Sequence, residues 1–416
     1  MIKILHFADA HIDIANHGRQ DPQSGLALRA QDFLKALDTI VNTAIERRVD
    51  LVIFAGDAYR DRTPVPTFQR EWGRRILRLS HAGIRTLLLV GNHDLSPAIG
   101  RAHALQEFDT LEVPHVIVLD RPRLLLPADL GGLPLQVLAL PWLSRSRMQA
   151  SLDATETRRE KVYEKIEELL GELLKKWLEE DIDPQLPVIL TAHASVMGAK
   201  YGGERSVMLG NDLVLPLSLV CDRRLDYVAL GHIHKAQDLN PDTRPPVIYP
   251  GSIERVDFGE VADDKYFVLV ELDEVGRGRA QVEWVKLEGR RYYDRSVNIT
   301  LPEEVTEQAI AALPTVEQFS DAILRLTVTY PREFDPLLDE TELRRYTEPA
   351  FEFHLVRRPQ MEARLRLPEH TLVSSMTPLE LLAYYWNTAG VEESLEELNR
   401  LAGEIIGGGE GEEPVT

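Results

Sequence analysis

The chain has 416 residues, more than one ordinary hydrophobic core holds, so its length favours two or three domains. Its apolar runs are too short to span a bilayer, and the opening MIKILHFADAHID has no basic region before its apolar stretch. The sequence therefore predicts neither a membrane span nor a signal peptide. A single cysteine, Cys221, excludes an intramolecular disulfide and favours a cytoplasmic location.

The net charge of -20 argues against a nucleic-acid partner, but its distribution weakens that argument. Residues 301–416 carry 9 basic and 23 acidic residues, whereas residues 1–300 carry 38 and 44. Because most of the excess acid lies in the last third, a local basic surface remains compatible with the first 300 residues.

The first third of the chain alternates predicted strands and helices. Apolar runs predict strands at 2–9, 49–57 and 84–94, and apolar residues at three-to-four spacing predict helices at 26–48 and 67–83. Strands at 115–120 and 133–142 are expected to continue the same sheet. Polar residues follow the strands, at the edge where open α/β sheets collect their functional groups.

The next part of the chain is expected to build a second sheet. Residues 155–180 predict a long, charged, amphipathic surface helix. Five strands follow with little helix between them, which predicts a mostly antiparallel sheet packed on the first; they cover 187–193, 226–234, 246–252, 265–273 and 281–288.

The predicted fold class is α/β, a two-sheet β-sandwich flanked by helices, with a small α+β domain and C-terminal helices. The predicted boundaries are 1–290 for the main domain and 291–360 for the small domain, which mixes short helices and strands. Residues 361–416 are expected to hold a linker, two helices and an acidic, glycine-containing flexible tail.

Five short polar blocks in the first 234 residues point to a metal site: Asp9-Ala-His11, Gly56-Asp57, Gly91-Asn92-His93-Asp94, Ala192-His193-Ala194 and Gly231-His232-Ile233-His234. Residues two apart in an extended chain point to one side, as in the first and last blocks. Carboxylate and imidazole together suit borderline divalent metals such as Mn²⁺, Fe²⁺ or Zn²⁺. Two such ions polarise a phosphoester and activate a water, so the blocks predict a metal-dependent phosphoesterase.

The ligands divide between two ions if the two oxygens of Asp57 bridge them. Metal one then takes Asp9, His11, Asp57 and His234, and metal two takes Asp57, Asn92, His193 and His232. His93 is left to face the substrate, where it would protonate the leaving oxygen or stabilise the pentacovalent phosphate. Asp94 is expected to orient His93.

These blocks resemble the calcineurin-like metallophosphoesterase superfamily, over about residues 1–270, and within it the SbcD-type DNA nucleases. The opening ILHFADAHID is similar to the nucleases' ILHxSDxHLG, and the run from Tyr249 to Glu260, followed by KYFVLVEL, is similar to their YPGS…DFGE…GFVLVE. The chain departs from the family at Ala8, where Ser is common, at Asp13, where Gly is common, and at Arg60, where Asp or His is frequent.

The resemblance implies a manganese-dependent nuclease of an SbcCD-like DNA repair complex. It implies 3'–5' exonuclease activity on double-stranded DNA, endonuclease activity on single strands and hairpins, and a homodimer that works with an SMC-like ATPase of the SbcC type. It also implies that the small domain caps the site and binds DNA.

Basic residues near the blocks are candidate phosphate contacts: Arg60, Arg62, Lys200, Arg205, Lys235 and Arg255. The two C-terminal helices have apolar faces, one with Leu379, Tyr385 and Trp386 and the other with Leu398 and Leu401. Two short helices cannot bury all of that surface alone, so they are candidates for docking on the ATPase.

Two other interpretations stay open. The first is a phosphoesterase for a small phosphodiester such as a cyclic nucleotide, which leaves the small domain and terminal helices without a purpose. The second is a non-catalytic scaffold that recruits an ATPase, which has no need for a complete ligand set.

Overall fold

The computed structural model describes residues 1–14, 19–95, 101–143, 159–202, 214–274, 280–360, 377–388 and 395–407. The chain divides into two compact units, Met1–Tyr293 and Asp294–Thr416. The three-domain division at residues 290 and 360 stays a prediction. No helix in the described ranges is both long and apolar enough to cross a membrane.

The first sheet of the larger unit has the order β14-β13-β1-β2-β3-β4. Strands β1 (Ile2–Phe7), β2 (Leu51–Phe54), β3 (Arg85–Leu89) and β4 (Val116–Leu119) are parallel neighbours, while β13 (Lys265–Leu272) and β14 (Gln281–Leu287) are antiparallel. Helices α1 (Leu28–Arg47) and α2 (Pro66–His81) connect β1 to β2 and β2 to β3. Parallel pairing requires such crossovers.

The second sheet has the order β11-β12-β10-β7-β6-β5. Its strands are β5 (Arg123–Leu125), β6 (Gln136–Leu140), β7 (Val188–His193), β10 (Tyr227–Gly231), β11 (Gln237–Asp238) and β12 (Val247–Tyr249). The central pairs β6–β7, β7–β10 and β10–β12 are parallel, and only the outer pairs are antiparallel.

Two details of the predicted topology are wrong. The second sheet is not mostly antiparallel, because its central strands are buried on both faces, which is typical of parallel strands. The sheets also exchange strands: residues 133–142 supply β6 of the second sheet, whereas 265–273 and 281–288 supply β13 and β14 of the first. A short apolar run does not encode which sheet it joins.

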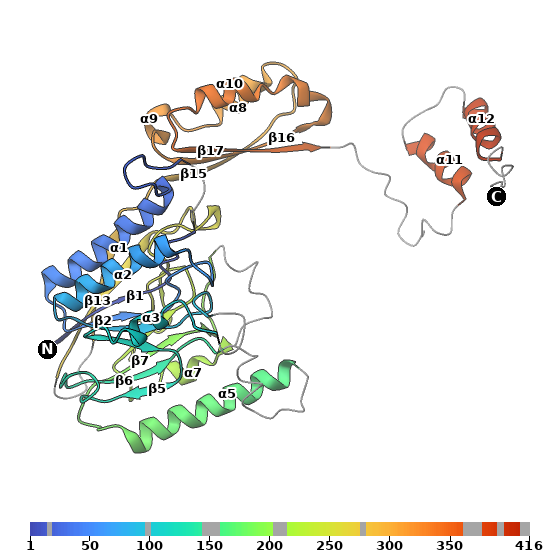
Figure 1. Cartoon of the computed structure of the whole chain (residues 1–416). Helices are drawn as coiled ribbons and strands as arrows, with labels where there is room; N and C mark the ends of the chain where they lie inside the picture. Colours follow the sequence, from blue (N-terminus) through green and yellow to red (C-terminus); the bar gives the residue numbers. More distant parts are fainter. Residues whose placement is uncertain are drawn as a thin grey trace, which may run out of the picture. The chain divides into compact units, whose positions relative to one another are not determined.

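Three apolar layers hold the larger unit together. One lies between the sheets, where Ile4 and Ile53 of the first meet Ile189 and Ala229 of the second. The second lies under α1 and α2, and the third under α5 (Arg159–Lys176), which ends in a π-helical turn at Trp177–Asp181. Figure 1 shows α1 and α2 on one side of the strands and α5 on the other.

Short elements complete the larger unit: α3 (Gln106–Thr110), β8 (Ser195–Val196), β9 (Val214–Leu215), α7 (Leu217–Val220) and the 3-10 turn Phe258–Glu260. The described strands β8 and β9 pair in parallel.

The smaller unit is built on a sheet of order β15-β16-β17, formed by Tyr292–Asn298, Ile323–Pro331 and Glu352–Gln360. Alternate residues of β16 are buried, and its apolar face packs on α8 (Val305–Ala311), the 3-10 helix Arg332–Leu337 and α10 (Glu340–Tyr346). A short helix α9 (Val316–Phe319) precedes β16, and helices α11 (Pro378–Thr388) and α12 (Leu395–Gly407) follow β17 (Figure 1).

Candidate metal centre

The predicted ligands meet at the carboxyl ends of five strands, β1, β2, β3, β7 and β10. Both sheets contribute because the inner strands of each run parallel and end at the same edge. Six of the predicted ligands form two clusters, Asp9–His11–His234 and Asp57–His193–His232. Within each cluster the ligand atoms lie within 4.8 Å of one another.

In the first cluster the two imidazoles face each other. The Nε2 atoms of His11 and His234 lie 3.1 Å apart. Both Asp9 oxygens lie 3.0 Å from the backbone N–H of His232, which donates to them and fixes the carboxylate.

In the second cluster an amide oxygen lies between two imidazoles. Oδ1 of Asn92 is 3.0 Å from Nε2 of His193 and 3.0 Å from Nδ1 of His232. Oδ2 of Asp57 lies 3.3 Å from Nε2 of His193 and 3.9 Å from Nε2 of His11 in the first cluster. Asp57 therefore stands between the clusters, where a bridging carboxylate is expected.

Hydrogen bonds fix three of the imidazoles with Nε2 facing the clusters. Nδ1 of His193 donates to the carbonyl of Ala55 at 2.7 Å, and Nδ1 of His11 to that of Tyr59 at 3.2 Å. Nδ1 of His234 lies 2.8 Å from the Glu260 carboxylate. Because Nδ1 of each ring is held by these contacts, Nε2 is the atom that faces the clusters and could bind a cation, and the donor set fits a dimetal site.

Four of these residues have left-handed backbone conformations, which side chains other than glycine rarely adopt: Asp9 (φ 51°), His11 (39°), Asp57 (64°) and His232 (99°). Each such conformation costs about 1 kcal/mol or more and persists only where its surroundings enforce it. Their concentration at one edge is typical of a functional site.

Glycines next to the ligands leave room that a side chain would fill. A Cβ at Gly56, where φ is 100°, would lie 2.3 Å from Nδ1 of His193. A Cβ at Gly91 would lie 2.1 Å from Oδ1 of Asp57. Both block glycines therefore allow the ligands their close approach.

In the metal-free protein, burial and the charges of neighbouring side chains shift the pKa values of the carboxylates and imidazoles of the site. Burial raises the pKa of Asp9 to about 7. Burial alone would also raise the pKa of Asp57, but the imidazoles of His193, His93 and His11 hold it below its usual range. Burial alone would lower the pKa of His193, but Asp57 and Asp9 raise it to about 9. The metal-free protein therefore holds a His193–Asp57 ion pair.

His93 lies beside the clusters, with its ring centroid 5.2 Å from that of His11. Its backbone N–H donates to Asp57 at 2.8 Å, and its Nδ1 donates to the carbonyl of Arg60 at 2.8 Å. Among the nitrogens of the ring, Nε2 is thus the one available to a substrate.

The hydrogen bonds that the structure shows for the Asp94 carboxylate go to backbone N–H groups of the loops after β2 and β3, and its predicted role of orienting His93 stays a prediction. Its buried carboxylate accepts from the backbone N–H of Asp57 (2.9 Å), Ala58 (3.0 Å) and Gly91 (2.9 Å). Burial and the charge of Asp57 raise its pKa to about 7. A buried carboxylate needs hydrogen-bond donors, and Asp94 finds three of them in backbone N–H groups. Two belong to Asp57 and Ala58, so Asp94 fixes the loop that carries Asp57.

Two residues that contact the ligands were not predicted as site residues. Glu260, in the DFGE run, holds Nδ1 of His234. Trp142 lies against His232, with ring centroids 4.9 Å apart, and against His193 at 6.1 Å. In the sequence the DFGE run carries only a family resemblance, and a tryptophan after a strand has no spacing that points to a metal site.

Three of the candidate phosphate contacts, Arg60, Arg62 and Lys200, have exposed side chains. Arg60 uses its backbone N–H and carbonyl in the loop after β2, which leaves its guanidinium in solvent. Lys200 uses its backbone groups to hold the side chain of Gln237.

The other three are less available. Lys235 forms an ion pair with Asp263 at 3.1 Å. Arg255 donates to the carbonyl of Arg290 at 3.5 Å and is partly buried. Arg205 lies outside the described residues.

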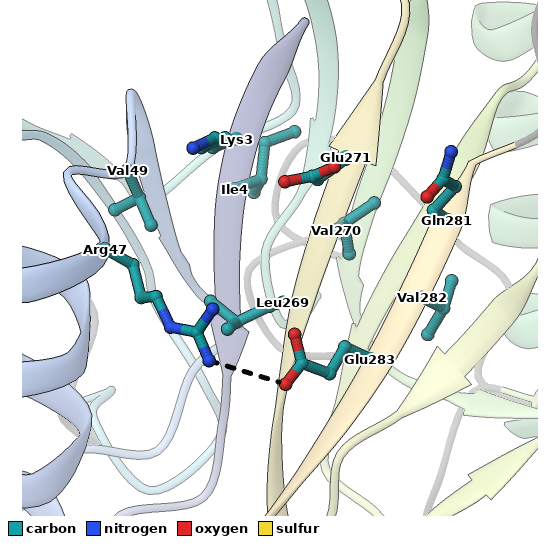
Figure 2. A pocket seen from close by; sticks show the side chains of 10 residues that line it. All are labelled: Lys3, Ile4, Arg47, Val49, Leu269, Val270, Glu271, Gln281, Val282 and Glu283. Carbon is teal, nitrogen blue, oxygen red and sulfur yellow. Dashed lines mark ion pairs between the residues drawn. The ribbon is translucent and has the colours of Figure 1, made fainter.

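A pocket of about 260 Å³ lies at the opposite, amino-terminal end of β1 (Figure 2). Lys3 and Ile4 line it with residues of β13 and β14, and an ion pair of 3.7 Å between Arg47 and Glu283 crosses one side. It contains none of the predicted site residues, and its mixed charges select no particular ligand.

The calcineurin-like phosphoesterase family model matches residues 2–236. The chain is 27% identical to the SbcD component of the nuclease SbcCD of Escherichia coli over 280 residues, 65% of this chain and 64% of that protein. It is 24% identical to the DNA double-strand break repair protein Mre11 of Archaeoglobus fulgidus over 357 residues, 84% of this chain and 71% of that protein. A crystal structure of a dimetal phosphatase from Danio rerio covers 68% of this chain and 98% of its own at 12% identity, with a TM-score of 0.40.

Proposed function

Because this chain belongs to the calcineurin-like phosphoesterase family, we propose that it is a manganese-dependent nuclease that hydrolyses phosphodiester bonds in DNA. One observation carries the proposal: two His/Asp clusters, joined by Asp57 and flanked by Asn92, meet beside an imidazole that is free at Nε2. Mixed carboxylate, amide and imidazole donors suit Mn²⁺.

Each residue of the site has a distinct task in this proposal. Asp9, His11 and His234 would hold one ion, Asn92, His193 and His232 would hold the other, and Asp57 would contribute to both. Such a pair supplies an activated water and neutralises the phosphate. His93 keeps one proton on Nδ1 for the Arg60 carbonyl. A second proton, taken up from solvent at Nε2, is the one that the imidazolium donates to the leaving oxygen, while Asp94 keeps the Asp57 loop in place.

The relatives favour DNA as the substrate. The alignment with the repair protein extends over 357 residues, well beyond the 2–236 of the family model. The similarity therefore includes part of the smaller unit as well as the metal blocks. We propose the same activities as the resemblance implies, 3'–5' cleavage of duplex ends and endonucleolytic cleavage of single strands and hairpins.

The proposal includes an SMC-like ATPase of the SbcC type and a homodimer. Helices α11 and α12 are amphipathic, and Leu379, Tyr385 and Leu401 on them are 40%, 47% and 43% exposed. Apolar residues left exposed on a helix pair are typical of a docking surface. The small domain at 291–360 would bind the DNA.

The test uses purified protein with Mn²⁺ on end-labelled duplex DNA, a DNA hairpin and bis-p-nitrophenyl phosphate, with Asp57→Ala as the control. Cleavage of DNA that disappears in the control supports the nuclease. Hydrolysis of the small diester alone, with and without the ATPase, would overturn DNA as the substrate and favour a small phosphodiester. No hydrolysis of any of the three by protein that binds Mn²⁺ would favour a scaffold.

A further inference from the structure

In the loop after β2, residues 56–61, most backbone groups form hydrogen bonds. Its carbonyls at Gly56, Asp57 and Ala58 accept from the backbone N–H of Asp9, Ala10 and Ile12 at 2.9, 2.8 and 3.2 Å. The carbonyl of Tyr59 accepts from His11, and that of Arg60 accepts from His93. The two ligand loops thus form one hydrogen-bonded ribbon.

Two carboxylates accept hydrogen bonds from N–H groups at the two ends of the same loop. Asp94 takes those of Asp57 and Ala58, at the start. Asp13 takes those of Arg60 and Asp61, at the end, with distances of 2.5 and 3.1 Å. Asp13 is 7% exposed, so solvent does not readily replace it as the acceptor.

Asp13 is connected to His93 by hydrogen bonds through one residue, Arg60. Asp13 binds the N–H of Arg60, and the carbonyl of Arg60 accepts the proton of His93 Nδ1 at 2.8 Å. Without Asp13 the end of the loop would lose both acceptors for its N–H groups. The Arg60 carbonyl would then have no fixed direction.

We infer that Asp13 is a positioning residue for His93, which acts through the main chain of Arg60. It keeps the Arg60 carbonyl on Nδ1, so that His93 carries a proton there and presents Nε2 to the phosphate. The inference rests on the proposed role of His93. The inference also gives one reason for the departures from the family pattern at Asp13 and Arg60. The acid at position 13 fixes the loop, and residue 60 then contacts His93 through its backbone carbonyl, whatever its side chain.

The tautomer of His93 is the direct readout, and it needs neither metal nor DNA. Two-bond ¹H–¹⁵N spectra of metal-free, ¹⁵N-histidine protein should show His93 protonated at Nδ1, with its signals assigned by their loss in His93→Gln. In Asp13→Ala the Nδ1 and Nε2 shifts of His93 should converge as the preference is lost. Asp61→Ala removes an exposed carboxylate of the same loop that accepts hydrogen bonds from Thr63, and should leave the His93 signals unchanged.

Kinetics separate positioning from folding. Asp13→Ala should lower kcat for the cleaved diester by roughly 10- to 100-fold, with KM and the number of bound Mn²⁺ ions unchanged. Asp13→Asn keeps one acceptor oxygen, so its kcat should lie between those of wild type and Asp13→Ala. This variant also tests the inference if Asp13→Ala does not fold. Unchanged His93 shifts in both variants, or loss of Mn²⁺ together with activity, would overturn the inference. A wild-type protein that cleaves no diester refutes the proposed function instead, since the spectra still report on the tautomer.

Discussion

Oε1 of Glu260 lies 2.8 Å from Nδ1 of His234, and the glutamate is 1% exposed. Its other oxygen accepts from Nζ of the buried Lys265 at 2.5 Å, and Lys265 in turn donates to Ser252 at 2.7 Å. Through Glu260 and Ser252, the contact between His234 and this buried ion pair connects the DFGE and YPGS runs to the last metal block. Burial alone would raise the pKa of Glu260, but His234 and Lys265 hold it well below its usual range.

Removing the charge of Glu260 should weaken metal binding. Glu260→Gln is expected to lower Mn²⁺ affinity at the Asp9 cluster by about 10- to 100-fold, because His234 loses the carboxylate that orients it and raises its basicity. Electron paramagnetic resonance of free Mn²⁺ during titration measures this.

The single variant leaves the Lys265 ammonium buried without its acid, so Glu260→Gln/Lys265→Met should restore folding but not affinity. Glu71→Gln is the matched control, because that buried acid pairs only with Arg70, Arg74 and Arg75 of α2 among the described residues. Equal loss of Mn²⁺ binding in the control would contradict the role of Glu260.

His93→Ala should keep both metal ions and lose most turnover. Its ring lies beside the clusters but its Nδ1 is committed to Arg60, so the side chain contributes proton transfer rather than a ligand. The expected loss in kcat is roughly 10²- to 10⁴-fold. Elemental analysis of the purified variant should find the wild-type metal content, and a loss of metal would sink the assigned role.

The meeting of ligands at one edge could be predicted because the signal is local. Asp9, Asp57 and Asn92 each come within three residues of a buried strand's end, and parallel strands bring such ends together. The structure also confirms the predicted α/β class with two sheets and flanking helices.

The supporting contacts could not be predicted, because they join side chains to backbone groups far along the chain. Asp13 and Asp94 bind N–H groups that any residue has, so no spacing reveals them. The prediction of which sheet each strand joins failed for a related reason. Both β6 and β13 are mostly apolar strands, and only tertiary packing places them in different sheets.

Metal binding should release protons at neutral pH. In the metal-free protein the pKa of His193 is raised to about 9, so at pH 7 its imidazole carries a proton that a metal must displace. Mn²⁺ affinity is therefore expected to fall as the pH falls below 9, by about tenfold per pH unit for one displaced proton. Calorimetry in two buffers of different ionisation enthalpy measures the release, and His193→Gln should reduce it by one proton.

His6 should make the fold less stable in acid. Its ring is buried between the sheets, 2.9 Å from the hydroxyl of Tyr227, and burial lowers its pKa to about 3. Between pH 6.5 and 3 the unfolded state binds a proton there that the folded state does not, so the free energy of unfolding falls as the pH falls. The expected slope from this group is about 1.4 kcal/mol per pH unit.

Urea unfolding of metal-free protein at pH 6, 5 and 4 tests the slope. His6→Gln is less stable at neutral pH but should lose less stability on acidification than the wild type. His81→Gln, which alters an exposed histidine at the end of α2, should keep the wild-type slope. Parallel curves for wild type and His6→Gln would contradict the assignment.

The helix pair α11–α12 should be needed for binding the ATPase but not for hydrolysis of the phosphodiester. Its exposed apolar residues Leu379 and Leu401 lie outside the metal clusters, so Leu379→Glu/Leu401→Glu should abolish binding of an SbcC-type ATPase and leave the basal Mn²⁺-dependent activity within about twofold. Deletion of residues 361–416 should do the same. A pull-down with the ATPase measures binding, and Glu397→Gln, an exposed polar change on α12, is the control. If the double variant and the deletion still bind, the partner docks elsewhere, and the apolar faces of the two helices serve only to pack them against each other.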